Sequence, residues 1–239
     1  MKEILKKIIK KIPIAFTQNQ RYDKQSKQVI SKICGSNSNC IDIGAHKGEV
    51  LDIMLKYAPQ GTHYAFEPIP PMFEALKRKY ADNTHCRIFD YALSNATGTA
   101  TFNYVVSNPS YSGLIKRKYD RPNEEDTQIE VRTEILDKVL PPDYAPQLIK
   151  IDVEGGELLV LEGAVKTITA HKPTIIFEHG LGASDFYGST PEKLFSLLVS
   201  CGLRIPTMQR WLANRPCFTE KEFKEHYYKS KDYYFIAYP

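Results

Sequence analysis

Three carboxylate side chains fall within six consecutive residues of this chain, at Asp152, Glu154 and Glu157. Like charges so close together raise one another's pKa, and such groupings are typical of functional sites. The preceding apolar run, Leu148–Ile151, predicts a strand, and two glycines then predict a turn into a helix. We expect Asp152, Glu154 and Lys150 to share one crevice as catalytic residues, and we interpret Glu157 as a favourable charge in the helix's first turn.

A second group of reactive side chains follows another apolar run, Thr174–Phe177, which ends in Glu178 and His179. The run predicts a strand whose carboxyl end lies at the same edge of the sheet as Asp152. Histidine is the side chain best suited to acid–base work or metal ligation near neutral pH. The converging carboxylates favour such a role for His179, and a structural histidine is the competing interpretation.

The stretch Cys40–Val50 predicts a cofactor site. Its apolar residues stop at Gly44 and an amphipathic segment begins after Gly48, which indicates a strand, a tight loop and a helix. In open α/β sheets this junction turns backbone N–H groups and a helix N-terminus toward a ligand, and glycines allow the ligand close to the backbone. We therefore expect a nucleoside cofactor here. His46 is a weaker candidate, because the loop can bind through its backbone alone.

Glu67 is the predicted ribose ligand. It ends an apolar run, precedes Pro68 and lies 25 positions after Asp42, near the spacing at which nucleotide-binding α/β folds place a carboxylate on the ribose. A carboxylate can accept hydrogen bonds from both ribose hydroxyls. A third run ends in Asp90, which would lie beside the base and accept from an exocyclic amine. A surface carboxylate at a strand end is the competing interpretation of Glu67.

These side chains need a sheet to hold them together. Strand and helix patterns alternate between residues 40 and 180, which predicts an α/β fold, and 239 residues suit one large domain. Residues 98–132 instead alternate like antiparallel strands around a polar stretch, and we predict inserted strands that form a flap over the site. A helix over 191–200 and strands near 203–207 and 233–237 complete the pattern.

Residues 1–14 predict a basic amphipathic helix, with isoleucines on one face and lysines around the other. Such a helix covers part of a core with a solvated lysine face, or it binds an anionic membrane surface or a partner. Both interpretations stay open. We accordingly predict an N-terminal helical extension over residues 1–37 and the main domain over residues 38–239.

The composition excludes several classes of protein. Hydrophobic residues make up 42% and charged residues 25%, as in ordinary globular proteins, and a net charge of +4 is too small to indicate a nucleic-acid partner. Five scattered cysteines without a C-x-x-C pair argue against a disulfide framework. The sequence shows no secretory signal and no apolar run of membrane-spanning length. We expect a cytoplasmic protein, with contact to the inner membrane face through residues 1–14 as the open alternative.

Four motifs together resemble the FkbM-type family of S-adenosylmethionine-dependent methyltransferases. In chain order they are Asp42-Ile-Gly-Ala-His-Lys-Gly48, Phe66-Glu67-Pro68, Ala92-Leu93-Ser94, and Ile149-Lys150-Ile151-Asp152-Val153-Glu154-Gly155 with Glu157. The similarity covers roughly residues 38 to 180, and the closing run at 232–237 is also similar. The resemblance implies a Rossmann-like class I methyltransferase fold, with a seven-stranded, mostly parallel sheet, helices on both faces and an antiparallel last strand.

The resemblance also implies the cofactor and the acceptor. S-adenosylmethionine would lie along the first loop, the ribose carboxylate and the third strand end, with Asp152 at its reactive side; the residues concerned are Asp42, Gly44, Ala45, His46, Gly48, Glu67, Pro68, Asp90, Tyr91 and Ala92. The family mostly O-methylates sugars, polysaccharides and polyketide-type natural products. We therefore expect a sugar, a glycan or a small molecule with a hydroxyl group as the acceptor.

A hydroxyl acceptor is a poor nucleophile and needs help to lose its proton. Our hypothesis is that Asp152, Glu154, Glu178 and His179 surround it and act as the base. Alternatively, Asp152, Glu178 and His179 hold a hard divalent ion such as Mg²⁺, Mn²⁺ or Ca²⁺. Two other functions stay open. A nicotinamide-dependent oxidoreductase would share the loop, although the spacing here is G-x-x-x-G, and a non-catalytic binding protein is disfavoured by the intact carboxylates.

Overall fold

The computed structural model describes residues 17–119 and 123–239. The basic helix predicted for residues 1–14 lies outside the described residues, and the predicted contact with a membrane surface lies there with it.

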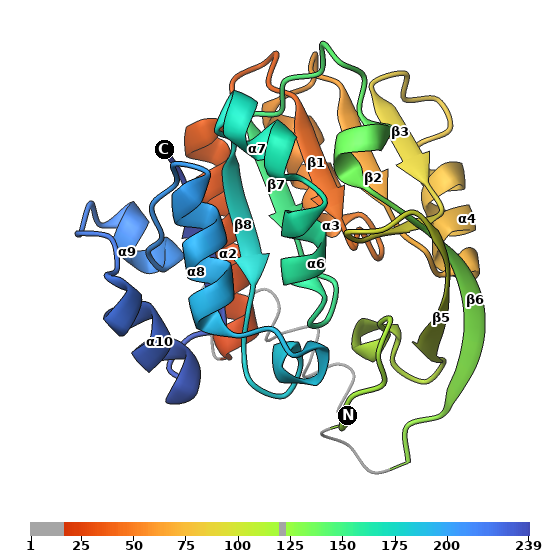
Figure 1. Ribbon diagram of the computed structural model, residues 1–239. Helices are drawn as coiled ribbons and strands as arrows, with labels where there is room; N and C mark the ends of the chain where they lie inside the picture. Colours follow the sequence, from red (N-terminus) through yellow and green to blue (C-terminus); the bar gives the residue numbers. More distant parts are fainter. Residues whose placement is uncertain (1–16, 120–122) are drawn as a thin grey trace, which may run out of the picture.

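Within the described residues, six strands form the central sheet in the order β3, β2, β1, β7, β8, β9 (Figure 1). Neighbouring strands are parallel from β3 to β8, and β9 runs antiparallel to β8. The bounds are β1 Cys40–Ile43, β2 His63–Phe66, β3 Cys86–Phe89, β7 Leu148–Ile151, β8 Thr174–Glu178 and β9 Tyr234–Ala237. The predicted α/β fold, with a mostly parallel sheet and an antiparallel last strand, is confirmed.

The expected count of seven strands is wrong for the described residues. The segment 203–207, predicted as a strand, lies beside β9 but forms two isolated antiparallel bridges, Arg204 with Tyr238 and Thr207 with Phe235. Pro206 stands between them; its carbonyl accepts from the Ile236 N–H, but its own nitrogen has no hydrogen to donate. The ladder is interrupted there, and the segment does not become a regular strand.

A second, three-stranded sheet extends beyond the carboxyl ends of the central strands (Figure 1). Its order is β4, β6, β5, with bounds β4 Tyr91–Leu93, β5 Gly98–Val105 and β6 Asp126–Glu134. The antiparallel pairing of β5 with β6 confirms the two strands predicted in the 98–132 region. β4 pairs in parallel with β6, so the chain leaves the central sheet at Asp90.

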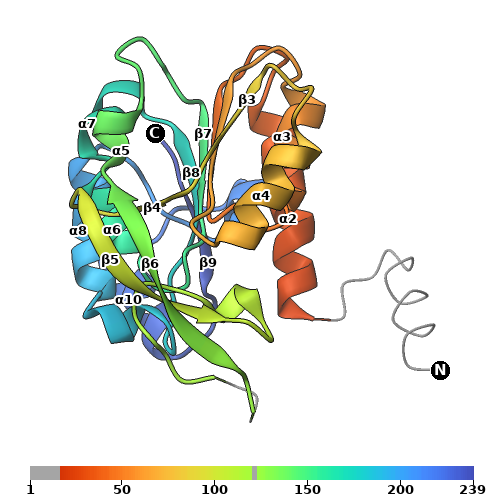
Figure 2. The same cartoon turned by 90° about the vertical axis from the view of Figure 1, so that its right-hand side faces the viewer.

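Helices cover both faces of the central sheet, as Figure 2 shows along its edge. One face carries α2 (Gln18–Ile33), α3 (Glu49–Tyr57) and α4 (Pro70–Lys79), and the other carries α6 (Glu157–Glu162), α7 (Val165–His171) and α8 (Pro191–Ser200). The remaining helices are α5 (Leu136–Val139), α9 (Met208–Leu212) and α10 (Glu220–Tyr228), with 3-10 turns η1 (Pro109–Tyr111) and η2 (Ser184–Tyr187). The description "N-terminal extension" fits α2 poorly, because it packs on α3 and α9 with Val29 and Ile30 fully buried.

The core explains why the central strands are short and apolar. Every residue of β1, β2 and β7 is buried, because helices cover both sides. Alternate residues enter opposite cores: Ile41 and Ile43 pack on the α6 side, and Cys40 packs with α2 and α3. Among the described residues, no helix is both long and apolar enough to cross a lipid bilayer.

Candidate active site

A cavity of about 760 Å³ opens at the carboxyl ends of the central strands. Its walls come from the loop between Gly44 and Gly48 (the glycine loop), the turn after β7, the end of β8, the η1 segment and α2. Most of the predicted site residues line it, namely Gly44, Ala45, His46, Glu67, Pro68, Tyr91, Ala92, Lys150, Asp152, Glu154 and Glu178. Four predicted residues are not among its lining: Asp42, Gly48, Asp90 and His179.

The two glycines of the first loop serve the packing of the chain. Gly44 has φ +75°, and a Cβ there would lie 1.8 Å from the Asp152 carbonyl oxygen, so glycine lets the ends of β1 and β7 meet. Gly48 has φ +74°, and a Cβ there would lie 2.4 Å from the Tyr80 hydroxyl. The predicted close approach to a ligand therefore applies to Gly44, which lines the cavity, while Gly48 makes room for Tyr80.

Glu67 fixes the shape of this loop. Its two carboxylate oxygens accept from the backbone N–H groups of His46 (2.8 Å) and Ile69 (3.0 Å), which ties the end of β2 to the glycine loop. Burial raises the pKa of Glu67 to about 7, against the opposing effect of these two N–H groups. A carboxylate has about four lone-pair positions, so two remain for ligand hydroxyls on the cavity side.

Asp42 lies beneath the site. Its side chain is fully buried, and its nearest charged partner is the Lys150 ammonium at 3.6 Å. Lys150 also donates to the Gly44 carbonyl (2.9 Å) and lies 3.4 Å from Asp152. Burial alone would lower the pKa of Lys150, but Asp152 and Asp42 hold it above its ordinary value. Asp42 therefore acts on the cavity only through Lys150. The sequence predicted that Asp42 would line the cofactor site, but its side chain does not line the cavity.

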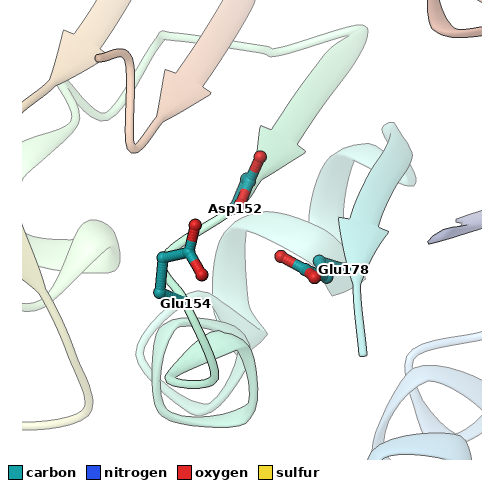
Figure 3. A group of neighbouring side chains, drawn as sticks. All are labelled: Asp152, Glu154 and Glu178. Atoms are coloured by element: carbon teal, nitrogen blue, oxygen red, sulfur yellow. The ribbon is translucent and has the colours of Figure 1, made fainter. Parts of the chain in front are cut away.

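Asp152, Glu154 and Glu178 turn their carboxylates toward one another (Figure 3), and one oxygen of each lies within 4.8 Å of the others. Burial alone would raise the pKa of Asp152, but Lys150 and hydrogen bonds from Tyr234 and Glu178 hold it below its usual range. Burial and the charges of Asp152 and Glu154 hold the pKa of Glu178 well above its usual range. The two neighbouring carboxyl groups thus differ in proton affinity, and Glu178 is the one that holds a proton more tightly.

Glu154 is held differently. It has φ +59°, in the left-handed region that side chains rarely adopt, and its carboxylate pairs with Arg117 from the segment between β5 and β6. Burial, followed by the charge of Asp152, raises the pKa of Glu154 to about 8 against the opposing charge of Arg117. This is a carboxylate whose proton affinity is close to that of a base working near neutral pH.

His179 does not join this cluster. It is fully buried, and its ring stacks on Tyr227 (4.7 Å between centroids) and Phe223 (6.2 Å). Both ring nitrogens lack a hydrogen-bond partner in the described part of the chain, and burial lowers the pKa of His179 to about 3. Successive residues at a strand end point to opposite sides, so Glu178 faces the carboxylates and His179 faces α10. The sequence-based placement of His179 beside Asp152 is therefore corrected.

Asp90 also lies outside the cavity. It is exposed at the point where the chain passes from β3 to β4, and Tyr91 and Ala92 line the cavity in its place. The turn between the two strands directs its side chain to solvent.

Part of the cavity wall comes from residues that the sequence did not predict. Tyr22 and Asp23 of α2 line the cavity, together with Tyr233 and Tyr234 at the start of the last strand. Tyr22 packs against both neighbouring tyrosines, with ring centroids 4.9 and 5.2 Å away. Residues 18–39 carry no motif, so nothing short of the tertiary packing signals this contact. The Arg117 charge was visible, but its pairing with Glu154 spans 37 positions.

The three neighbouring carboxylates form a better site for a hard cation than the predicted set, which included the His179 nitrogen. Asp152, Glu154 and Glu178 offer three oxygen ligands, which Mg²⁺, Mn²⁺ and Ca²⁺ prefer. Glu154 thus takes the place that the sequence assigned to His179, whose ring lies among aromatic side chains.

Comparisons with known proteins agree with this architecture. Methyltransferase sdnD of Sordaria araneosa is 28% identical over 157 residues, which cover 54% of this chain and 61% of that protein. The crystal structure of methyltransferase FkbM from Methylobacillus flagellatus KT superposes with a TM-score of 0.54 at 19% identity, covering 85% of this chain and 44% of that one, and supports the fold. The chain thus spans less than two thirds of the length of both relatives. The methyltransferase FkbM domain matches residues 42–205, more than half of the chain, and the chain therefore belongs to the FkbM family of methyltransferases.

Proposed function

We propose that this protein is an S-adenosylmethionine-dependent O-methyltransferase that acts on a hydroxyl group of a sugar, a glycan or a related natural product. Membership in a methyltransferase family and the name of the sdnD relative support methyl transfer. One observation carries the choice of a hydroxyl acceptor: the carboxylates of Asp152, Glu154 and Glu178 converge in the same cavity as Glu67 and the glycine loop.

The cofactor half of the cavity fits S-adenosylmethionine, which supplies a methyl group on a sulfonium when bound. Glu67 keeps lone pairs for the two ribose hydroxyls while its other lone pairs hold His46 and Ile69. The loop at Gly44–His46 offers its backbone, and Tyr91 and Ala92 form the wall that we assign to the adenine. These residues bind and orient, because an in-line displacement depends mainly on alignment in a dry site.

The acceptor half removes a proton. As the acceptor oxygen takes up the methyl group, its O–H bond breaks and the proton passes to a carboxylate. Glu154 is the base whose pKa, about 8, lies nearest neutral pH, and Asp152, held by Lys150 and Tyr234, orients the hydroxyl. The side chains of Glu154 and Asp152 are 19% and 26% exposed, and this partial burial strengthens these interactions.

A divalent ion on Asp152, Glu154 and Glu178 is the alternative way to activate the hydroxyl, because positive charge lowers its pKa. Treatment with EDTA followed by addition of Mg²⁺, Mn²⁺ or Ca²⁺ separates the two mechanisms. Turnover that survives EDTA supports the base, and turnover restored by one ion supports the metal.

The function is tested in two steps. Calorimetric titration with S-adenosylmethionine and with NAD separates a methyltransferase from an oxidoreductase, and affinity for neither favours a binding protein. A methyl-release assay with a panel of glycan acceptors then compares Asp152→Asn with wild type. Asp152→Asn should lose turnover by about a hundredfold or more with cofactor affinity largely kept. Asp143→Asn, an exposed carboxylate before β7, is the matched control. Near-normal turnover of Asp152→Asn would refute the assignment.

We also propose a cytoplasmic location. All five cysteines are free, which agrees with a reducing compartment.

A further inference from the structure

Arg117 lines the cavity, and its pairing with Glu154, the proposed base, explains only one side of its guanidinium. Its side chain is 13% exposed and lines the cavity beside Glu154. It comes from the segment between β5 and β6, far in sequence from the strands that carry the other site residues. Burying a guanidinium is costly, so its contacts indicate what it serves.

Two contacts fix the orientation of this guanidinium. Its Nη2 donates to the Glu154 carboxylate, and its Cζ lies 4.6 Å from the centre of the Tyr111 ring. An ion pair on one side and an aromatic face on the other hold the planar guanidinium in one orientation. The direction of its remaining N–H groups is therefore set before any ligand arrives.

One of these N–H groups has no partner. The Nε atom of Arg117 is buried and makes no hydrogen bond to any residue in the ranges 17–119 and 123–239. Buried donors in native structures are almost always satisfied, because an unsatisfied one loses its hydration without return. The atom is covered by protein, so a ligand oxygen would satisfy it after a small rotation of the Arg117 side chain, which lines the cavity.

We propose that Arg117 binds the methyl acceptor, by donating from its Nε–H to an oxygen next to the hydroxyl that is methylated. Glu154 shares the same guanidinium and faces the reacting hydroxyl, so the pair addresses two oxygens on neighbouring carbon atoms. Vicinal diols, as in a sugar ring, present that pattern. The inference rests on the proposed function, because it assumes that the acceptor occupies this half of the cavity.

The test is ligand-observed NMR by saturation transfer on the full chain loaded with S-adenosylhomocysteine. The probes are the methyl glycosides of glucose, galactose and mannose at about 10 mM, a concentration that reveals millimolar affinity. At least one should bind wild type, and Arg117→Lys should weaken that binding about tenfold, because lysine keeps the charge but loses the Nε donor. Arg210→Lys is the matched control: Arg210 also pairs with a glutamate, Glu222, and lies 4.4 Å over a ring, Phe218, but outside this cavity.

A second measurement needs no variant. Monodeoxy derivatives of the glycoside that binds should lose affinity for wild type about tenfold when the neighbouring hydroxyl is removed, and should lose nothing further in Arg117→Lys. The inference is overturned if no glycoside binds wild type, if Arg117→Lys binds within twofold of wild type, or if the deoxy derivatives bind unchanged. Calorimetry with S-adenosylmethionine distinguishes the two failures: loss of cofactor affinity in wild type refutes the proposed function, and retained affinity confines the failure to Arg117.

Discussion

Glu157 should make the protein less stable as the pH rises. The side chain begins α6 and is fully buried, and its Oε1 accepts from the Val153 (3.0 Å) and Gly155 (3.1 Å) N–H groups. Its Oε2 is buried without a partner in the described residues. Burial raises the pKa of Glu157 from its ordinary value of 4.5 to about 7, against the opposing effect of the backbone N–H groups.

The sign follows from proton binding. Between pH 4.5 and about 7 the folded protein holds a proton on Glu157 that the unfolded chain has released, so the free energy of unfolding falls as the pH rises. At about 1.4 kcal/mol for each tenfold in proton affinity, the difference amounts to roughly 3 kcal/mol. Glutamine is uncharged at every pH and keeps the Oε1 acceptor. The free energy of unfolding of Glu157→Gln minus that of wild type should therefore rise by roughly 3 kcal/mol between about pH 5 and about pH 8.

Urea denaturation of both proteins across this pH range measures the effect, and the thermal midpoint should move by roughly 10 °C in the same sense. Glu162→Gln, at an exposed position on the same helix, is the control and should change the unfolding free energy by less than about 0.5 kcal/mol at any pH. If the stability difference between Glu157→Gln and wild type stays constant from acid to alkaline pH, folding does not raise the pKa of Glu157.

Three further outcomes are expected. Gly44→Ala should lose about 3 kcal/mol of stability or more in denaturant titrations, because its Cβ would lie 1.8 Å from the Asp152 carbonyl oxygen, whereas Gly35→Ala, with no atom within 4 Å, should be tolerated. Glu67→Gln should weaken S-adenosylmethionine binding by about tenfold to a hundredfold in calorimetry, because the amide NH₂ must face a backbone N–H that an oxygen accepted before; unchanged affinity would remove Glu67 from the site. His179→Phe should keep turnover within about twofold in the methyl-release assay, since the ring lies among Tyr227 and Phe223, and a loss of about a hundredfold would return His179 to the mechanism.

The sequence predicted best what depends on the order of elements along the chain. Runs of apolar residues that end in Gly44, Glu67 and Asp152 can be recognised one at a time, and parallel strands bring their carboxyl ends to one edge wherever the sheet order falls. The glycine loop, Glu67 and the carboxylates after β7 were therefore placed in one cavity correctly, while the binding of a ribose by Glu67 stays a prediction. The Pro191–Ser200 helix was also correct, because Thr190 caps it and Pro191 begins it.

What failed depends on side-chain direction and on contacts distant in sequence. Asp42 and His179 stand at the right ends of the right strands, yet one points beneath the cavity and the other into the aromatic core. Neighbouring side chains of a strand point to opposite faces, and the sequence alone does not show which face meets the cavity. The ion pair of Arg117 with Glu154, and the contribution of Tyr22 to the cavity wall, bring together segments that are distant in sequence. No local pattern predicts such contacts.

The segment 204–207 also affects how the molecule meets its own copies. The exposed edge of a sheet presents a row of unpaired N–H and C=O groups on which another chain can add as a strand. Beside β9 that row is taken up by residues 204–207, which pair with Tyr238 and Phe235 through two bridges. On the outer side of this segment the Ile205 carbonyl accepts from the Phe218 N–H, and the Thr207 carbonyl accepts from the Trp211 N–H, so an incoming strand finds these acceptors already used. The opposite edge, β3, offers four residues, Cys86–Phe89. Short and covered edges of this kind protect a parallel sheet from edge-to-edge aggregation while it folds.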